Sequence, residues 1–185
     1  MGDVILTIWV SAWEMDCCQP DAVVGETWSA CVLLEPAEPW WYGQSNRSTP
    51  PPEVGVVELE LDVVRAAPSA DGYGLARLGA VSIGVKGAEA VGPQRVRGRL
   101  WNQWHGPDPD GLEFEETAVE GVVRRVRRVP IDYQRQIADT RSFMPVGELQ
   151  PIEAHSTIER RETSLSDPSN HHYHDELLVD LEVAD

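Results

Sequence analysis

The feature that most constrains this chain is an alternation of apolar and polar residues with a period of two. The clearest case places acidic residues between apolar ones: Val57, Glu58, Leu59, Glu60, Leu61, Asp62 and Val63. Because successive side chains of a strand point to opposite faces, this period predicts a strand with one buried face. The same alternation near both ends of the chain, at 4–10 and 177–183, predicts strands there too.

Segments rich in proline, glycine and serine separate these runs, as in a protein built from many short strands. Further strands are predicted at 29–34, 78–85, 95–104 and 119–129, with Pro130 limiting the last; short strands are expected within 146–158 and a short helix within 132–143. Residues 35–53 are predicted to form a loop or linker, and 159–176 a mobile loop. We therefore expect a single mainly β domain over 1–185, a small barrel or sandwich of short antiparallel strands with long Pro/Gly-rich loops.

The charge balance of the chain is strongly acidic. Asp and Glu number 31 against 15 Lys and Arg, which gives a formal net charge of -16. A field of this sign repels phosphate backbones, so we expect no direct nucleic-acid binding. It favours a basic protein partner, with simple solubility as the alternative explanation. Lys86 is the only lysine, and this composition is typical of a GC-rich genome.

The three cysteines, Cys17, Cys18 and Cys31, do not suggest a secreted disulfide framework, because the number is odd and two are adjacent. The apolar start of the chain has no basic segment before it, so we expect no signal peptide. No apolar run approaches membrane-spanning length. The prediction is a cytoplasmic protein that does not interact with membranes.

A histidine run near the C-terminus is the candidate metal site. His171, His172 and His174 combine with Cys17 and Cys18 in a hypothetical zinc or nickel site, which His105, His155 or a cysteine would complete. In an extended segment His172 and His174 point the same way. The alternative, which we favour, is a solvated loop without a cofactor, because no HExxH or paired CxxC motif occurs.

Tryptophan is abundant, with seven in the chain. Trp9, Trp28 and Trp101 fit the expected core. Trp40, Trp41 and the adjacent Tyr42 are the candidate ligand-binding residues, because large aromatic side chains in a Pro-rich loop must fold back or face a ligand such as a sugar.

The arginines at 124–128 resemble a phosphate-binding stripe. On a regular strand Arg124 and Arg128 face opposite Arg125 and Arg127, which splits the stripe between two faces. We therefore expect these arginines to pair with nearby acids. No glycine-rich phosphate loop or nucleophile motif occurs in the chain.

The segment from Trp13 to Cys18, followed by Pro20, Val24-Gly25-Glu26 and Trp28, resembles the opening of an uncharacterised actinobacterial domain family. That opening runs W-x-M-x-C-C-G-x-P-F-x-V-G, and Gln19 stands here at the position of its glycine. The resemblance brings no activity with it.

These observations favour a non-catalytic binding protein that acts on a basic partner, in the manner of an inhibitor, an immunity protein or a nucleic-acid mimic. A metal-binding enzyme or regulator and a small-ligand or sugar-binding module are the alternatives. Self-association through exposed strand edges also stays open.

Overall fold

The computed structural model describes most of the chain. The described residues are 4–11, 20–36, 54–103, 112–135, 141–145, 150–152 and 171–184, with the backbone alone described at 130–135, 141–145, 150 and 171–175.

Strands dominate the described part of the chain, which confirms the prediction of a mainly β protein. In chain order the elements are β1 (Val4–Val10), β2 (Thr27–Pro36), β3 (Val56–Arg65), β4 (Tyr73–Leu78), β5 (Val81–Lys86), β6 (Gly92–Asn102), the 3-10 helix η2 (Phe114–Thr117), β7 (Ala118–Arg135), β8 (Arg141–Pro145), β9 (Gln150–Ile152) and β10 (His171–Val183). No helix in this part of the chain has the length and apolarity needed to cross a membrane.

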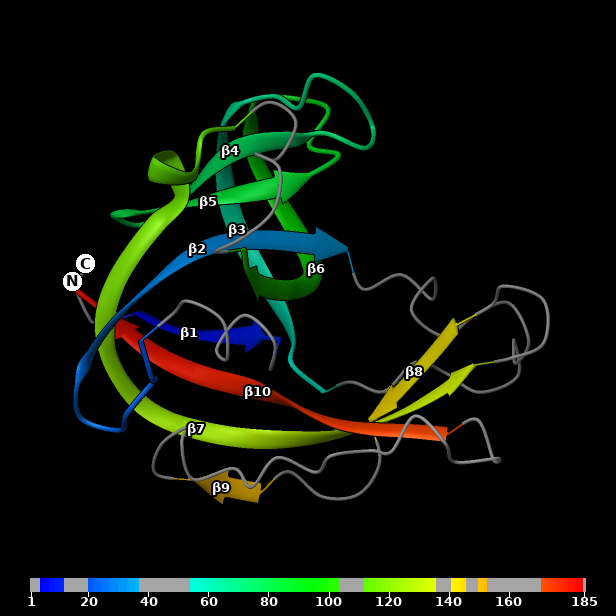
Figure 1. Ribbon diagram of the computed structural model, residues 1–185. Coiled ribbons are helices and arrows are strands. Elements are labelled where there is room, and N and C mark those ends of the chain that lie inside the picture. The colour runs from blue at the N-terminus through cyan, green and yellow to red at the C-terminus, as the bar shows by residue number, and fades with distance from the viewer. Residues whose placement is uncertain are drawn as a thin grey trace.

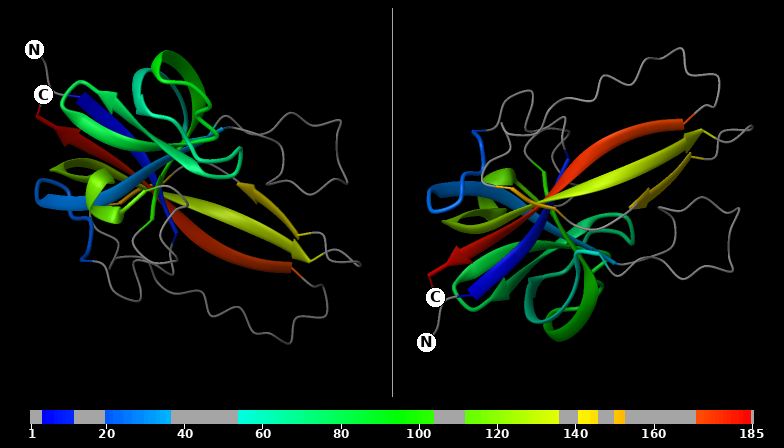
Figure 2. Two further views of the ribbon diagram at one scale, coloured as in Figure 1. Left: turned by 90° about the horizontal axis from the view of Figure 1, so that it is seen from above. Right: turned by 90° about the horizontal axis from the view of Figure 1, so that it is seen from below.

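Eight of the strands close into a barrel in the order β10-β1-β6-β3-β4-β5-β2-β7, because β7 pairs in turn with β10 (Figure 1). Most neighbours are antiparallel, and β1–β6 and β2–β5 are parallel. The chain ends lie together, since Val4 of β1 pairs with Val183 of β10 (Figure 2). This result confirms the small-barrel prediction.

A contact between β2 and β6 crosses the ring of eight strands. The two strands pair from Val32↔Asn102 to Pro36↔Gly98, while the other edge of β6 pairs with β3 and then with β1. The Asn102 side chain reinforces the contact, because its Oδ1 accepts a hydrogen bond from the Cys31 amide at 3.1 Å. At Gly98 the backbones are so close that a Cβ atom would collide with the Glu35 carbonyl oxygen.

Alternate positions of all eight barrel strands face a single apolar core. One buried residue from each strand illustrates it: Ile8, Leu34, Leu61, Ala76, Ile83, Leu100, Val126 and Val179. The acidic positions of β3 lie on the opposite face, as the period of two predicts.

A second apolar layer covers part of the outer face of the barrel. Trp9 and Trp101 lie on neighbouring strands with ring centroids 5.5 Å apart, and Trp9 packs with Val129 and Leu178. Gly55, which precedes β3, crosses over this layer, because a Cβ there would meet Leu178 and Trp9. Together with buried Trp28 in the main core, this confirms the packing role predicted for these tryptophans.

Several predicted element boundaries are wrong. The strand expected over 78–85 is confirmed as β5 except at its start, because Leu78 ends β4 and a turn at Gly79, whose φ of 60° favours glycine, joins the two strands. The helix expected within 132–143 is wrong for the described residues of this segment, because 132–135 are the end of β7 and 141–143 are the start of β8. The loop expected over 35–53 is wrong at its start, since Glu35 and Pro36 belong to β2, and 37–53 lie outside the described residues.

Pro130 does not end β7, contrary to the prediction. It pairs with Asp175 of β10, at the point where the other edge of β7 passes from β9 to β8. No described residue pairs with β7 on that second edge at Pro130, so a strand partner on that edge does not require an N–H donor there. The strand can therefore continue through the proline.

The close approach at Gly98 makes a testable prediction. Changing Gly98→Ala should lower the free energy of unfolding by about 1–3 kcal/mol, because β2 and β6 must separate to admit the new methyl group. Urea unfolding followed by tryptophan fluorescence measures the change. Val91→Ala, at a side chain that is 67% exposed, is the control and should cost less than about 0.5 kcal/mol. Equal losses in both variants would contradict the β2–β6 contact.

Candidate functional site

The sequence-predicted site residues fall into two groups. Trp40, Trp41, Tyr42, Cys17 and Cys18 lie outside the described residues, so the ligand-binding and thiolate parts of those hypotheses stay predictions. Cys31 is described and is buried in the barrel wall, with its Sγ 3.7 Å from the Phe114 carbonyl oxygen. The interpretation of Cys31 as a core thiol is therefore confirmed.

The histidine run belongs to a strand. His171, His172 and His174 form the beginning of β10 and pair with Gln134, Tyr133 and Ile131 of β7, respectively. The mobile loop predicted over 159–176 is therefore wrong at its end, because 171–176 are strand residues. Among the residues whose side chains are described, no group of His, Cys, Asp or Glu is placed to hold a metal ion.

A β-bulge rearranges the arginines of β7. The pairing with β10 shifts between Asp180↔Arg125 and Leu181↔Val123, which leaves Arg124 as the extra residue. Arg124 and Arg125 consequently both bind acids of β10, Glu182 and Asp180. The predicted split of these two arginines between opposite faces is wrong, and the predicted pairing with acids is confirmed.

Asp180 is the centre of a buried polar network on the outer face of β1, β7 and β10. Its carboxylate accepts hydrogen bonds from Thr7 Oγ1 at 2.8 Å, Arg125 Nε at 2.7 Å and Arg127 Nη2 at 2.5 Å. The residue is only 4% exposed. A buried carboxylate with three donors is a structural link between strands, because its lone pairs are already used.

A second buried carboxylate lies on the same face. The Trp9 indole N–H donates to Glu176, and the Arg99 guanidinium lies 5.9 Å from the centre of the Trp9 ring. Arg99 Nε also donates to the Val54 carbonyl oxygen at 3.0 Å. These charges support the outer apolar layer and are not accessible to a large ligand.

Tyr73, Glu35 and Lys86 form a cluster near the end of β2. The Tyr73 hydroxyl donates to the Glu35 carboxylate, and Lys86 Nζ lies 3.9 Å from Glu35 Oε1. Burial, followed by the hydrogen bond to Glu35, raises the pKa of Tyr73 far above its usual range. The hydroxyl therefore stays protonated and acts as a donor rather than as a base.

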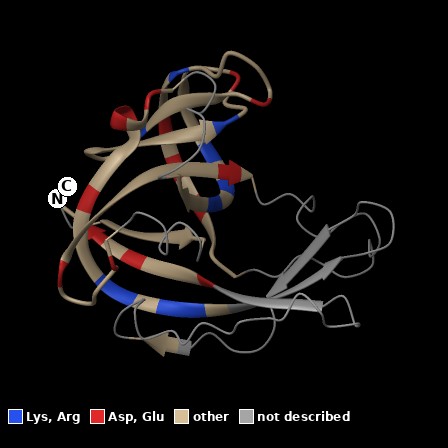
Figure 3. Ribbon diagram, in the orientation of Figure 1, with Lys and Arg blue, Asp and Glu red and all other residues tan. Residues whose placement is uncertain are grey.

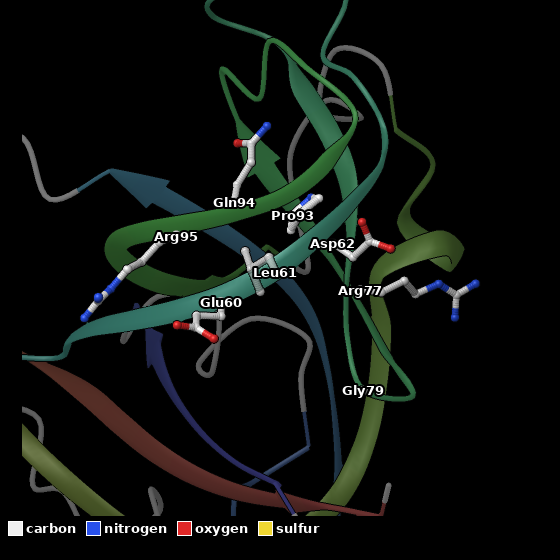
Figure 4. Close-up of a pocket in the computed structure, with 8 residues that line it drawn as sticks. All are labelled: Glu60, Leu61, Asp62, Arg77, Gly79, Pro93, Gln94 and Arg95. Atoms are coloured by element: carbon white, nitrogen blue, oxygen red, sulfur yellow. The ribbon is translucent and has the colours of Figure 1, made fainter.

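A hollow of about 480 Å³ lies on the outer face where β6, β3 and β4 meet (Figure 4). It is lined by Glu60, Leu61, Asp62, Arg77, Gly79, Pro93, Gln94 and Arg95. Figure 4 shows Asp62 beside Arg77, its partner across β3 and β4, and Glu60 toward the end at which Arg95 lies. The hollow combines two carboxylates and two guanidinium groups.

The charged side chains around this hollow differ in whether they have an ion-pair partner. Arg95 Nε is bound to Glu58 Oε1 at 2.5 Å. Glu60, Asp62 and Arg77 are exposed, and no hydrogen bond or ion pair joins their side chains to other residues of the described structure. In the sequence, Glu60 and Asp62 are recognisable only as the polar side of a strand, and no pattern marks Arg77 as a site residue.

Most described bases on the exterior are bound to acids of the same chain. Arg65 forms a double hydrogen bond with Glu116, and these bonds lower the pKa of the Glu116 carboxyl group. The other salt bridges join Lys86 to Glu35, Arg95 to Glu58, Arg124 to Glu182, and Arg125 and Arg127 to Asp180. Figure 3 shows the basic positions of β7 in blue next to the acidic positions of β10 in red.

The fold and its exterior define a small closed β-barrel with a packed core and a charged outer surface. Residues 4–183 match the model of DUF6578, a family of unknown function, and the chain belongs to this family. This confirms the expected membership of an uncharacterised domain family. Searches of curated proteins and of solved structures found no match.

The Asp180 network makes a prediction about stability. Asp180→Asn should lower the free energy of unfolding by about 2–3 kcal/mol, because Arg127 loses its charged partner in a largely buried position. Glu182→Gln is the matched control, since its partner Arg124 is 52% exposed, and it should cost less than about 1 kcal/mol. Urea unfolding at neutral pH measures both. A larger loss for Glu182→Gln than for Asp180→Asn would contradict this assignment.

Proposed function

We propose that this protein is a non-catalytic binding protein whose acidic exterior recognises a basic protein partner. An inhibitor, an immunity protein or a nucleic-acid mimic works by this electrostatic logic, because a dense acidic surface competes with phosphate for basic sites. On this proposal the protein acts in the cytoplasm and does not itself bind nucleic acid.

The supporting observation is that exposed acids outnumber exposed bases on the described surface, and that most of the exposed bases are already in ion pairs. Of the exposed described bases, Arg65, Arg95, Arg124 and Arg125 are already held in ion pairs by acids of the chain. Exposed acids are more numerous, and they are Glu26, Glu58, Glu60, Asp62, Asp71, Glu89, Glu113, Glu115 and Glu120. Arg77 and Arg97 are the other exposed bases, so nine exposed acids stand against six exposed bases among the described residues, and the field that a partner meets is negative.

Capture from extracts of the native host tests this proposal. The tagged protein should retain a basic partner at about 0.1 M salt and release it as the salt concentration rises, because screening weakens exposed charge pairs. Neutralising Glu26→Gln, Glu60→Gln, Asp62→Asn and Glu120→Gln together should abolish the capture, which mass spectrometry of the eluate measures.

The matched control replaces exposed apolar residues, Val64→Ser and Val91→Ser, and should leave capture unchanged. A partner that is not basic, or one that both sets of substitutions release equally, would overturn the proposal.

Metal binding by the histidine run is the second candidate function. The observation that favours it is that His171, His172 and His174 belong to a strand paired with β7, and metal ligands are usually carried by such ordered elements. In this candidate the histidines, with Cys17 and Cys18, hold zinc or nickel.

Elemental analysis of untagged protein purified without chelator tests the metal candidate. It predicts about one zinc or nickel ion per chain, lost when all three histidines are changed to Ala. Metal-free wild-type protein would exclude the candidate. Binding of a small ligand or sugar by Trp40, Trp41 and Tyr42 stays a prediction.

A further inference from the structure

We propose that the outer edge of β3 is the docking site for the basic partner, and that it takes an extended segment with lysine or arginine at alternate positions. This inference rests on the proposed function and names the surface that would bind the partner. Three features carry it: an open strand edge, a row of acids with the spacing of a strand, and the hollow beside them.

The second edge of β3 is open over its first half because β4 pairs only with the last residues of β3. β3 pairs with β6 along its whole length from Val56 to Val63, but its pairing with β4 begins only at Asp62↔Arg77. Among the described residues, none pairs with the second edge of β3 from Val56 to Leu61. An extended peptide can add to such an edge through main-chain hydrogen bonds.

The acids of β3 have the spacing that such a peptide would present. Glu58, Glu60 and Asp62 are exposed and occupy every second position, so they share the outer face. Side chains of an added strand also alternate, so basic residues two apart would face Glu58 and Glu60 along the open edge, and a long basic side chain could reach Asp62 diagonally, because β4 takes the position directly opposite it. Glu58 is already bound to Arg95, whereas no ion pair joins Glu60 or Asp62 to other residues of the described structure.

The hollow lies at the point where the added segment would reach the β4–β5 turn. Glu60 and Asp62 line it together with Arg77 and Gly79 (Figure 4). Because Figure 4 shows Glu60 and Asp62 at separate ends of the hollow, each carboxylate suits the ammonium or guanidinium group of a separate basic side chain. The Arg77 guanidinium suits a peptide carbonyl or a carboxylate of the same segment.

Fluorescence anisotropy with two labelled peptides tests this site. In one peptide arginine and alanine alternate, and the other has the same composition with its arginines adjacent. At about 0.1 M salt the alternating peptide should bind more tightly. Glu60→Gln/Asp62→Asn should weaken its binding about fivefold or more, since two exposed ion pairs are lost.

The matched control Glu26→Gln/Glu120→Gln removes the same charge near the β2–β7 pairing and should leave the affinity of the alternating peptide within about twofold of wild type. Equal weakening by both variants, or equal affinity for both peptides, would overturn the β3 site while leaving recognition of basic partners by the whole acidic surface intact. Failure of wild-type protein to bind either peptide would overturn the β3 site, and the capture experiment would then decide the proposed function separately.

Discussion

The pairing of β2 with β6 is the contact on which the rest of the barrel depends. Where β2 crosses, β6 is bonded along both edges, to β2 on one side and to β3 and β1 on the other. The β2–β6 pairing brings two walls of the eight-stranded ring into direct contact. The inward positions are consequently filled by apolar side chains such as Leu34 and Leu100. The partner proposed for this protein would therefore meet the exterior of the barrel.

The sequence predicts the strands well where burial on one face sets the pattern. β3 shows the strict alternation because one face meets the core and the other meets water. The closure of the barrel is not predictable in this way. The β2–β6 pairing joins Val32 to Asn102 across a long separation in sequence, and it depends on the absence of a side chain at Gly98. Periodicity carries no information about which distant strand is the neighbour.

The errors of prediction arise where tertiary pairing overrides the local pattern. The polar run His171–Glu176 has no alternation, yet it is a strand because β7 extends alongside it. The bulge at Arg124 reverses the expected face of one arginine, and a single extra residue cannot be seen without the partner strand. The candidate hollow is not predictable for the same reason, since Arg77 comes to lie opposite Asp62 only through the pairing of β4 with β3.

The choice of arginine over lysine links the composition to the acidic exterior. Lys86 is the only lysine among 15 basic residues. A guanidinium group offers several donors in a fixed plane, so it can hold a carboxylate through two bonds, as Arg65 holds Glu116. Asp180 accepts from two arginines at once. The two arginines held by Asp180 also stabilise the contact between β7 and β10. The acids that outnumber these arginines then set the sign of the surface. The docking site proposed on β3 combines acids at every second position with a strand edge that no described residue pairs.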